Sequence, residues 1–593
     1  MSSAQPSTDG VVSYSISIAG KALASDYQVL RIDVRKQVNR IGYALIEIRD
    51  GCVAEGAFIA SDSDTFNPGK AITIAMGYGG DDKTVFTGII SKQSVSINNQ
   101  STSVLQLECK HPAVRMTNVR NNACHFDIKD SDIIKKIADK YSITAKPEAT
   151  KVTHQQMVQY YATDWDFILT RAQANGQLVF AEDEGLSINK PETAGTPAAK
   201  LVYGNNILAF NADLNAVQHY PEVSSFSWQS EDQKLLEVKA VKPEVSDAGD
   251  LSSQELAEQM DNEPLLLQHG ASLSKEDMQA WADAYWQNSA MANICGSVSA
   301  QGIAELKPGV IIELDGVGKH FNGKVWVNKV EHKMARGNWV SHIGFGLTSV
   351  WFGHKPDVHT PINNGLLPSV RGLQIGVVSK IDTSKDPQKS YRVQVKLPLI
   401  SSDTEGVWAR LGCAYAGKEY GCFFLPEVGD EVVLGFLDND PRSPIVLSSL
   451  YSKAYPPAAE GKAEKPQKYL ITKNQLKLCF DDENKIIHLE TPDGSEVTLS
   501  DKDGISLKAK KDINIESTDG SIFLKAKKDL MLNAKGNFDL GAQQIEQHAK
   551  ADCKIEATNV QQKAKSQFKA QGSLAELSAS GNTTVKGAMV MIN

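Results

Sequence analysis

The sequence predicts a mainly β protein in three parts: an α+β region of β-barrel-like domains, a small closed barrel, and a C-terminal array of short strands. Three observations lead to this fold class. Alternating apolar and polar residues recur through the first 362 residues and indicate half-buried strands. Short alternating runs separated by turns fill residues 367–452. Beyond residue 500, pairs of apolar residues recur about every eight positions, which is the signature of a repeat architecture.

Length and charge exclude several classes of protein. At about 150 residues per domain, 593 residues hold several domains. The chain has 62 Lys and Arg against 71 Asp and Glu, so it lacks the basic excess of a general nucleic-acid binder. We expect neither a secretion signal nor a membrane span, because the first residues are polar and no run of 18 apolar residues occurs. The eight cysteines form no CxxC pair, which favours reduced, mostly buried thiols of a protein made in the cytosol.

Three helices are expected to interrupt the strands of the first part. Helical spacing of apolar residues and side chains suited to helix N-caps mark them. They comprise the stripe of Ile133, Ile134, Ile137 and Tyr141, the segment from Thr163 to Asn175 with Gly176 at its end, and a segment that begins at Ser274.

The second part, residues 367–452, is expected to form a closed barrel of the OB type, because about five strands fit in this length. The expected strands include Gly376–Ile381, Tyr391–Leu397, Gly406–Leu411 and Glu431–Leu437. OB barrels often bind oligonucleotides, but this one carries 9 Lys and Arg against 10 Asp and Glu. Its charge argues against a groove that follows a nucleic-acid backbone.

A proline-containing linker over residues 453–470 precedes the third part, residues 471–593. From Asp501 to Asn593 there is no Arg, Pro, Trp or Tyr. The octapeptide ISLKAKKD at 505–512 returns as IFLKAKKD at 522–529. The apolar pairs that define the octads are Ile505 and Leu507, Ile513 and Ile515, Ile522 and Leu524, Leu530 and Leu532, and Phe538 and Leu540.

One octad cannot stabilise itself. Each inward apolar side chain contributes about 1.5–3 kcal/mol when buried, whereas ordering eight backbone residues costs about 8–16 kcal/mol. The missing contacts have to come from stacked turns and from other chains. We therefore predict a triple-stranded β-helix formed by three chains, with the ten residues of the octad pairs as its shared core. A single-chain β-solenoid is the less favoured alternative, because eight residues are too few for a coil with its own core.

Four stretches carry a resemblance to a known family. The segments are 423–444 (FFLPEVGDEVVLGFLDNDPRSP), 406–410 (GVWAR), 163–185 and 306–346. They resemble the OB-domain signature and the hub domain of VgrG spike proteins from type VI secretion and related contractile injection systems. The resemblance implies a phage-hub-like domain over residues 1–362 that forms a pseudo-sixfold trimeric ring, an OB collar and a puncturing needle.

The resemblance also implies partners. These are an Hcp-like inner-tube protein, baseplate proteins, a PAAR-repeat tip protein with effectors, and a transient contact with the target membrane. A separate tip protein is expected because the last histidine is His548, so the terminus lacks the H-x-H pair of self-metallated needles. The docking surface for that cap is expected at Met589, Val590, Met591, Ile592 and Asn593. Assembly in a bacterial cytoplasm and delivery outside the cell on contraction follow from the same resemblance.

No catalytic, cofactor or metal site is assigned from the sequence. The stretch GYGGDDKT at 77–84 lacks the glycine directly before Lys83 that a phosphate loop requires, so a hairpin turn is favoured. His354 and His359 near Asp357 are interpreted as surface residues. Only about 20 residues separate Leu450 from Leu470, too few for an inserted enzyme. A trimeric tail-fibre or adhesin-like binding module with a β-helical stalk is the alternative function, and an enzyme is the third choice.

Overall fold

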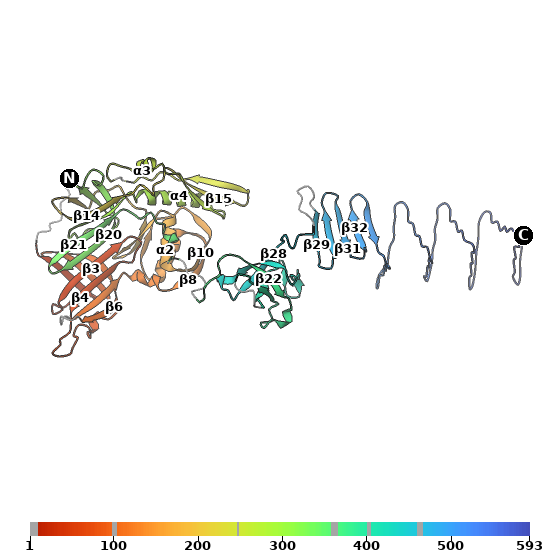
Figure 1. Cartoon of the computed structure of the whole chain (residues 1–593), viewed down its shortest axis with the longest axis horizontal. Helices are drawn as coiled ribbons and strands as arrows, with labels where there is room; N and C mark the ends of the chain where they lie inside the picture. The colour runs from red at the N-terminus through yellow and green to blue at the C-terminus, as the bar shows by residue number, and fades with distance from the viewer. Residues whose placement is uncertain are drawn as a thin grey trace. The chain divides into compact units, whose positions relative to one another are not determined.

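The computed structural model describes residues 10–97, 103–245, 248–356, 358, 366–399, 405–458 and 467–592. The chain divides into two compact units, Met1–Pro456 and Pro457–Asn593, and each is treated by itself. Strands far outnumber helices among the described residues, which confirms the predicted mainly β fold class (Figure 1). The expected part boundaries at residues 362 and 367 and the middle of the expected linker, 459–466, border on or lie outside the described residues.

A large, mostly antiparallel sheet dominates the first unit. Eleven of its strands follow the order β14-β18-β21-β20-β3-β4-β7-β6-β5-β1-β2. Two more strands branch from β20: β19 pairs with β20, and β13 pairs with β19. Their bounds are β1 Val12–Ile18, β2 Lys21–Ala22, β3 Val29–Gln37, β4 Tyr43–Arg49, β5 Ala71–Tyr78, β6 Asp81–Ile97, β7 Ser103–Lys110, β13 Ala199–Val202, β14 Ile207–Leu214, β18 Ile294–Gln301, β19 Ile311–Asp315, β20 Gly323–Ala335 and β21 Asn338–Phe345. Alternate residues such as Ile32, Ile46 and Ile74 face a fully buried core, as strand periodicity requires.

The glycine-rich stretch at 77–84 is a hairpin turn, as predicted. Tyr78 lies opposite Asp81, so Gly79 and Gly80 alone connect β5 to β6. Both have positive φ angles, +62° and +90°, which a two-residue turn of this kind needs and which glycine adopts without strain.

Three smaller sheets and four α-helices make up the rest of the structure described up to residue 356. The strands are β8 Arg120–Lys129 with β10 Thr153–Thr163; β9 Ala145–Pro147 with β11 Leu178–Glu182 and β12 Gly185–Asn189; and β15 Val223–Gln229 with β16 Lys234–Lys239 and β17 Leu265–His269. The helices are α1 Asp130–Lys140, α2 Asp164–Ala174, α3 Ser253–Gln259 and α4 Lys275–Ala290. Short 3-10 turns lie at Asp64–Phe66, Pro112–Thr117 and Phe352–His354.

The three predicted helices are confirmed; α2 and α4 have the expected N-caps, whereas α1 begins without a side-chain cap. The Thr163 hydroxyl accepts a hydrogen bond from the Asp166 backbone N–H at 3.0 Å, and Ser274 does the same for Asp277. Helix α3 was not predicted, although Ser252 and Glu255 form a capping box at its start. It buries only Leu256 and Ala257, so its sequence carries too short an apolar stripe to be recognised.

A buried ionic cluster joins three of these elements. The Asp130 carboxylate, 1% exposed at the start of α1, accepts hydrogen bonds from Arg171 Nε and Nη2 at 2.7 and 2.8 Å and from Asn175 Nδ2 at 2.9 Å. His154 Nε2 of β10 lies 3.0 Å from the same carboxylate. Burial by itself would raise the pKa of Asp130, but the hydrogen bonds and charge of Arg171 outweigh it and hold that pKa below its ordinary value.

The second predicted part contains a closed five-stranded barrel. Its strands are β22 Gln374–Lys380, β23 Val393–Lys396, β24 Val407–Leu411, β27 Glu431–Phe436 and β28 Pro444–Ser449, paired in the order β22-β23-β24-β28-β27 and closed by β27 against β22. Val378, Val393, Val395 and Val432 are fully buried inside it. The short hairpin of β25 Ala416–Gly417 and β26 Tyr420–Gly421 lies outside the barrel sheet, and 3-10 turns occupy Thr383–Lys385 and Leu437–Asn439.

The cysteines differ from the expectation. All eight are free, but only Cys109 and Cys479 are buried in the single chain, and Cys124, Cys413, Cys422 and Cys553 are exposed. The expectation of mostly buried thiols is therefore wrong for this chain, because Cys413 and Cys422 flank the outer hairpin and Cys553 lies in the repeat. No helix in the described parts is long and apolar enough to cross a membrane.

Candidate functional site

The second unit begins with an antiparallel meander of five strands (Figure 1). They are β29 Gln467–Ile471, β30 Lys477–Asp481, β31 Ile486–Glu490, β32 Glu496–Ser500 and β33 Gly504–Lys508. Each strand pairs with the one before it along the chain, in a register without bulges. The register places one row of residues side by side across all five strands: Leu470, Leu478, Leu489, Val497 and Leu507.

This row belongs to a nearly all-apolar face. Because side chains alternate between faces along a strand, positions two residues away share the face of the row. These neighbours include Phe480, Ile487, Leu499 and Ile505, which lie opposite one another in the same register. We call the nine residues of the two rows the apolar face.

The opposite face of the meander is mostly polar, although Ile471, Cys479 and Ile486 also lie on it. Lys477 Nζ lies 2.9 Å from Glu490, and Lys508 Nζ lies 3.1 Å from Glu496. The hydrogen bond from Lys477 holds the pKa of Glu490 below its ordinary value. Pairs this exposed contribute little to stability, so their effect is to keep this face compatible with water.

The apolar face has no partner within the described residues of the second unit. Leu489 is 44% exposed and Leu507 is 57% exposed. A hollow of about 610 Å³ borders the row from Leu470 to Leu507 and Ile513, and its lining also includes the charged residues Lys477, Glu490, Glu496 and Lys508. Exposed apolar patches of this kind mark association surfaces in soluble proteins.

The octads beyond β33 form no strand pairs within residues 509–592, although the chain runs back and forth in regular turns (Figure 1). Ile505 and Leu507 of the predicted core lie on β33 in the apolar face. The other eight predicted core residues lie in the unpaired segment and are between 50% and 68% exposed. Their shared burial between chains stays a prediction.

The predicted cap-docking residues lie at the end of this segment. Met589, Val590, Met591 and Ile592 are exposed, and Asn593 lies outside the described residues. Their role also stays a prediction.

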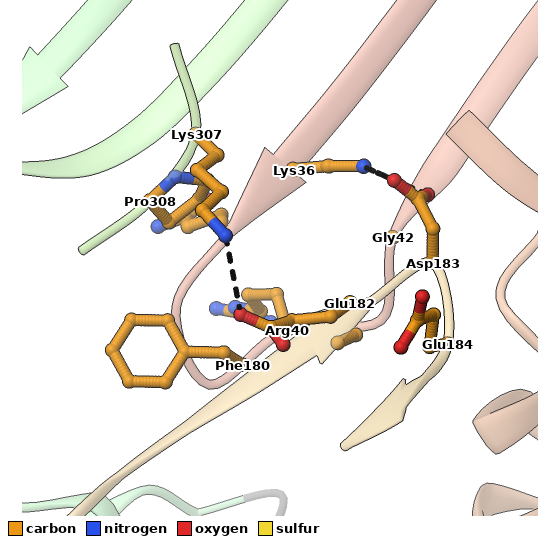
Figure 2. Close-up of a pocket in the computed structure, with 11 residues that line it drawn as sticks. Lys36, Arg40, Gly42, Phe180, Glu182, Asp183, Glu184, Lys307 and Pro308 are labelled. Carbon is orange, nitrogen blue, oxygen red and sulfur yellow. Dashed lines mark hydrogen bonds and ion pairs between the residues drawn. The ribbon is translucent and has the colours of Figure 1, made fainter. Parts of the chain in front are cut away.

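A pocket of about 340 Å³ lies in the first unit, between the end of β3, the β11–β12 hairpin and residues 307–308 (Figure 2). Lys36 Nζ lies 2.9 Å from Asp183, and Lys307 Nζ lies 3.6 Å from Glu182. The Thr87 backbone N–H also donates to Asp183 at 2.9 Å. Sequence reasoning did not single out these residues. Their charges pair across the pocket, and this arrangement ties the surrounding loops together without forming a nucleophile and base pair.

Three family models match the chain. The Alg8 N-terminal domain matches residues 8–336, which is more than half of the chain. The type VI secretion system/phage-baseplate injector OB domain matches residues 374–451, the five-stranded barrel. A family of uncharacterised proteins conserved in bacteria matches residues 487–565, from β31 into the octads.

Curated relatives match short stretches of the chain. The type VI secretion system spike protein VgrG1b of Pseudomonas aeruginosa is 32% identical over 99 residues, 16% of this chain and 13% of that protein. VgrG3 of Vibrio cholerae is 36% identical over 64 residues, 10% of this chain and 6% of that protein. The chain thus matches only a small part of each of these relatives.

Among solved structures, a 43 kDa tail protein of prophage MuSo2 from Shewanella oneidensis has a TM-score of 0.44 at 12% identity, covering 57% of this chain and 99% of that one. An Escherichia coli component of the type VI secretion system has a TM-score of 0.36 at 14% identity, covering 73% and 99%. On the family model that covers more than half of its length, the chain belongs to the Alg8 N-terminal domain family, and over shorter stretches it is similar to the type VI secretion system/phage-baseplate injector OB domain and to VgrG spike proteins.

Proposed function

We propose that three copies of the chain form the central spike of a contractile injection apparatus and puncture the target envelope with a needle built from residues 471–593. The observation that carries this proposal is the apolar face of the meander, which continues into octads that form no strand pairs among the described residues. Three such faces packed around an axis would bury the apolar rows and satisfy the strand edges between chains.

The first test is the mass of the assembly. We expect the purified full-length chain to be a trimer at micromolar concentration, because a single octad array cannot bury its own apolar side chains. Multi-angle light scattering measures this directly. A monomer would overturn the proposal.

The remaining parts of the proposal concern architecture and partners. Residues 1–362 would seat on an Hcp-like inner tube and the baseplate, residues 367–452 would form the collar, and residues 453–470 would lead into the needle. The spike would assemble in the bacterial cytoplasm and leave the cell on contraction. The chain would act mechanically and not as an enzyme, and a peptidoglycan-degradation assay with the purified trimer tests this last point.

We further propose that the needle ends in a docking surface for a PAAR-repeat tip protein that carries effectors. The supporting observation is the run of exposed apolar side chains from Met589 to Ile592, an end that favours capping. Deleting residues 588–593 should leave the trimer intact, because only about one octad in a dozen is lost, while abolishing co-purification with the cap. Undiminished capture of the cap by the truncated trimer would show that it docks elsewhere.

A further inference from the structure

The large sheet of the first unit is an internal repeat. In the first module, residues 12–110, strands pair in the order β1-β5-β6-β7-β4-β3. In the second module, residues 199–345, strands pair in the order β13-β19-β20-β21-β18-β14. Each strand of the first module therefore corresponds to the strand at the same place in the second order. The corresponding pairings are antiparallel in both modules with one exception: β13 and β19 are parallel, whereas β1 and β5 are antiparallel.

Backbone details confirm the equivalence of the two modules. A Pro-Gly turn precedes β5 and β19, and the two glycines, Gly69 and Gly309, have φ angles of +97° and +96°. The Gly69 N–H donates to Ile90 at 2.7 Å, and the Gly309 N–H donates to Val327 at 2.8 Å. Ile90 of β6 is therefore the counterpart of Val327 of β20.

Irregularities in the strand pairing coincide as well. The β6–β7 ladder shifts register directly after Ile90, and the β20–β21 ladder shifts directly after Val327. The β3–β4 ladder shifts after Val29, and the β14–β18 ladder shifts after Ile207. Such bulges are specific features of a strand, and counting from them makes β14 the counterpart of β3, residue by residue.

The two modules join within the chain through β3 of the first and β20 of the second. In this seam Met334 lies opposite Ile32, His332 opposite Val34, and Glu331 opposite Arg35. One face of the seam is buried, because His332 is 3% exposed and Met334 is 7% exposed, whereas Arg35 on the other face is exposed.

Within the chain, β3 of the first module pairs with β20 of the second. The counterparts of these two strands, β14 of the second module and β6 of the first, do not pair with each other. Among the described residues, positions 92–97 of β6 pair with β7 alone, and β14 pairs with β18 alone. Val95 and Ile97 of β6, the counterparts of His332 and Met334, are 46% and 68% exposed. An open strand edge with exposed apolar side chains is a template for pairing with another chain.

We propose that β14 of one copy pairs antiparallel with β6 of the next copy, in the register that β3 and β20 use within the chain. Counting from the bulges gives five opposed pairs: Gln93 with Leu214, Ser94 with Asp213, Val95 with Ala212, Ser96 with Asn211, and Ile97 with Phe210.

The side chains agree with this register, although the register was derived from the backbone alone. On one face Ile97 meets Phe210 and Val95 meets Ala212, so two apolar pairs are opposed, and Gln93 meets Leu214 at the end of the ladder. On the other face Ser94 meets Asp213 and Ser96 meets Asn211. A slip of one residue would move apolar side chains to the wrong face.

This contact joins unlike edges, so it repeats head to tail and closes into a ring when the rotation permits. The number of copies, three, rests on the proposed needle trimer. Three chains of two modules would then form one continuous sheet around a six-module ring. The family resemblance implies the ring, and the pairing of β14 with β6 specifies the strands and the register that would join its subunits.

Cysteine cross-linking of the full-length chain tests the register. In a background with Cys124, Cys413, Cys422 and Cys553 replaced by Ser, the Ser94→Cys/Asp213→Cys variant should form disulfides between chains on mild oxidation, seen as dimer and trimer bands on a non-reducing gel. Directly opposed residues have Cβ atoms about 4.5–5.5 Å apart, close enough for a disulfide after small adjustments. The Arg35→Cys/Glu331→Cys variant occupies the equivalent seam positions and should link within one chain.

A shifted pair gives the matched control. Ser94→Cys/Ala212→Cys places the two thiols on opposite faces of the proposed sheet, so it should link on the order of tenfold more slowly. Light scattering before oxidation separates this inference from the trimer proposal. A trimer in which the seam control links but Ser94→Cys/Asp213→Cys does not, or links no faster than the shifted pair, overturns the inference alone. A monomer overturns both.

Hydrogen exchange of the unmodified protein gives a second measurement that needs no variant. In the trimer the amides of residues 93–97 and 210–214 should be protected as strongly as those of β3. Exchange at the rate of an open edge would overturn the pairing.

Discussion

The double variant Ile522→Lys/Leu524→Lys is expected to lose the trimer. In the proposed needle each substitution places an ammonium group in the shared interior, and threefold symmetry makes six such groups. Burying an unpaired charge costs several kcal/mol per group even after relaxation, more than one octad layer contributes. Light scattering should show mostly monomer, and limited proteolysis should cut the C-terminal unit within the octads.

Phe523→Lys is the matched control. Phe523 lies between the two core positions and is 88% exposed, so pleat alternation places it on the outer face of the proposed needle. This variant should keep the wild-type mass and protease resistance. If Phe523→Lys breaks the trimer while Ile522→Lys/Leu524→Lys preserves it, the octad register is shifted by one residue.

The second large effect is expected in the first unit, from Asp130→Asn. The substitution removes the charge that Arg171 and His154 face, and it leaves a largely buried guanidinium without its carboxylate. Breaking a buried ion pair in this way costs about 3–5 kcal/mol. Seven of the eight tryptophans lie before residue 362, so tryptophan fluorescence during urea unfolding reports mainly on this region.

Asp440→Asn serves as the control. Asp440 pairs with Arg442 on the barrel surface, where the Arg442 side chain is 63% exposed, and its loss should change the urea midpoint little. Equal midpoints for Asp130→Asn and the wild type would show that the buried cluster does not stabilise the fold.

The same carboxylate gives the first unit a pH dependence. The pKa of Asp130 is lower in the folded chain than in the unfolded chain. Its contribution to the free energy of unfolding is therefore fully present above the unfolded pKa, about 4, and is lost as the pH falls toward the folded pKa. The urea midpoint should drop below pH 4 in the wild type and less steeply in Asp130→Asn. Parallel profiles would assign the acid sensitivity to other groups.

Several features were predictable because they depend on neighbouring residues. The start of α2 follows from the side chains of Thr163 and Asp166, and the turn at Gly79 and Gly80 follows from glycine's access to positive φ. The octads can be recognised from the regular spacing of Ile505, Leu507 and the apolar pairs that follow them. The small barrel was found from short alternating strands and turns, with boundaries within about two residues of those observed, which is within the usual uncertainty of element ends.

Other features depend on which distant strands meet. The apolar face of residues 467–508 appears only when the register sets Leu470 beside Leu478 and Val497 beside Leu507. Before residue 500 the loops between the strands vary in length, so the sequence shows no fixed period there. The partners of Asp130 in the ionic cluster likewise lie 24 to 45 residues from it in the sequence, so no local sequence pattern predicts the cluster.

By itself the sequence determined a mainly β chain with a barrel, capped helices and a terminal repeat of apolar pairs, because helix caps, turns and apolar periodicity act over a few residues. Only the tertiary structure decided that the first unit is built from two equivalent modules. Those modules share little sequence beyond the Pro-Gly turns at Gly69 and Gly309, and their likeness lies in strand order, bulges and hydrogen bonds. Strand pairing is a contact between residues far apart in the chain, and many side-chain combinations satisfy the same backbone ladder.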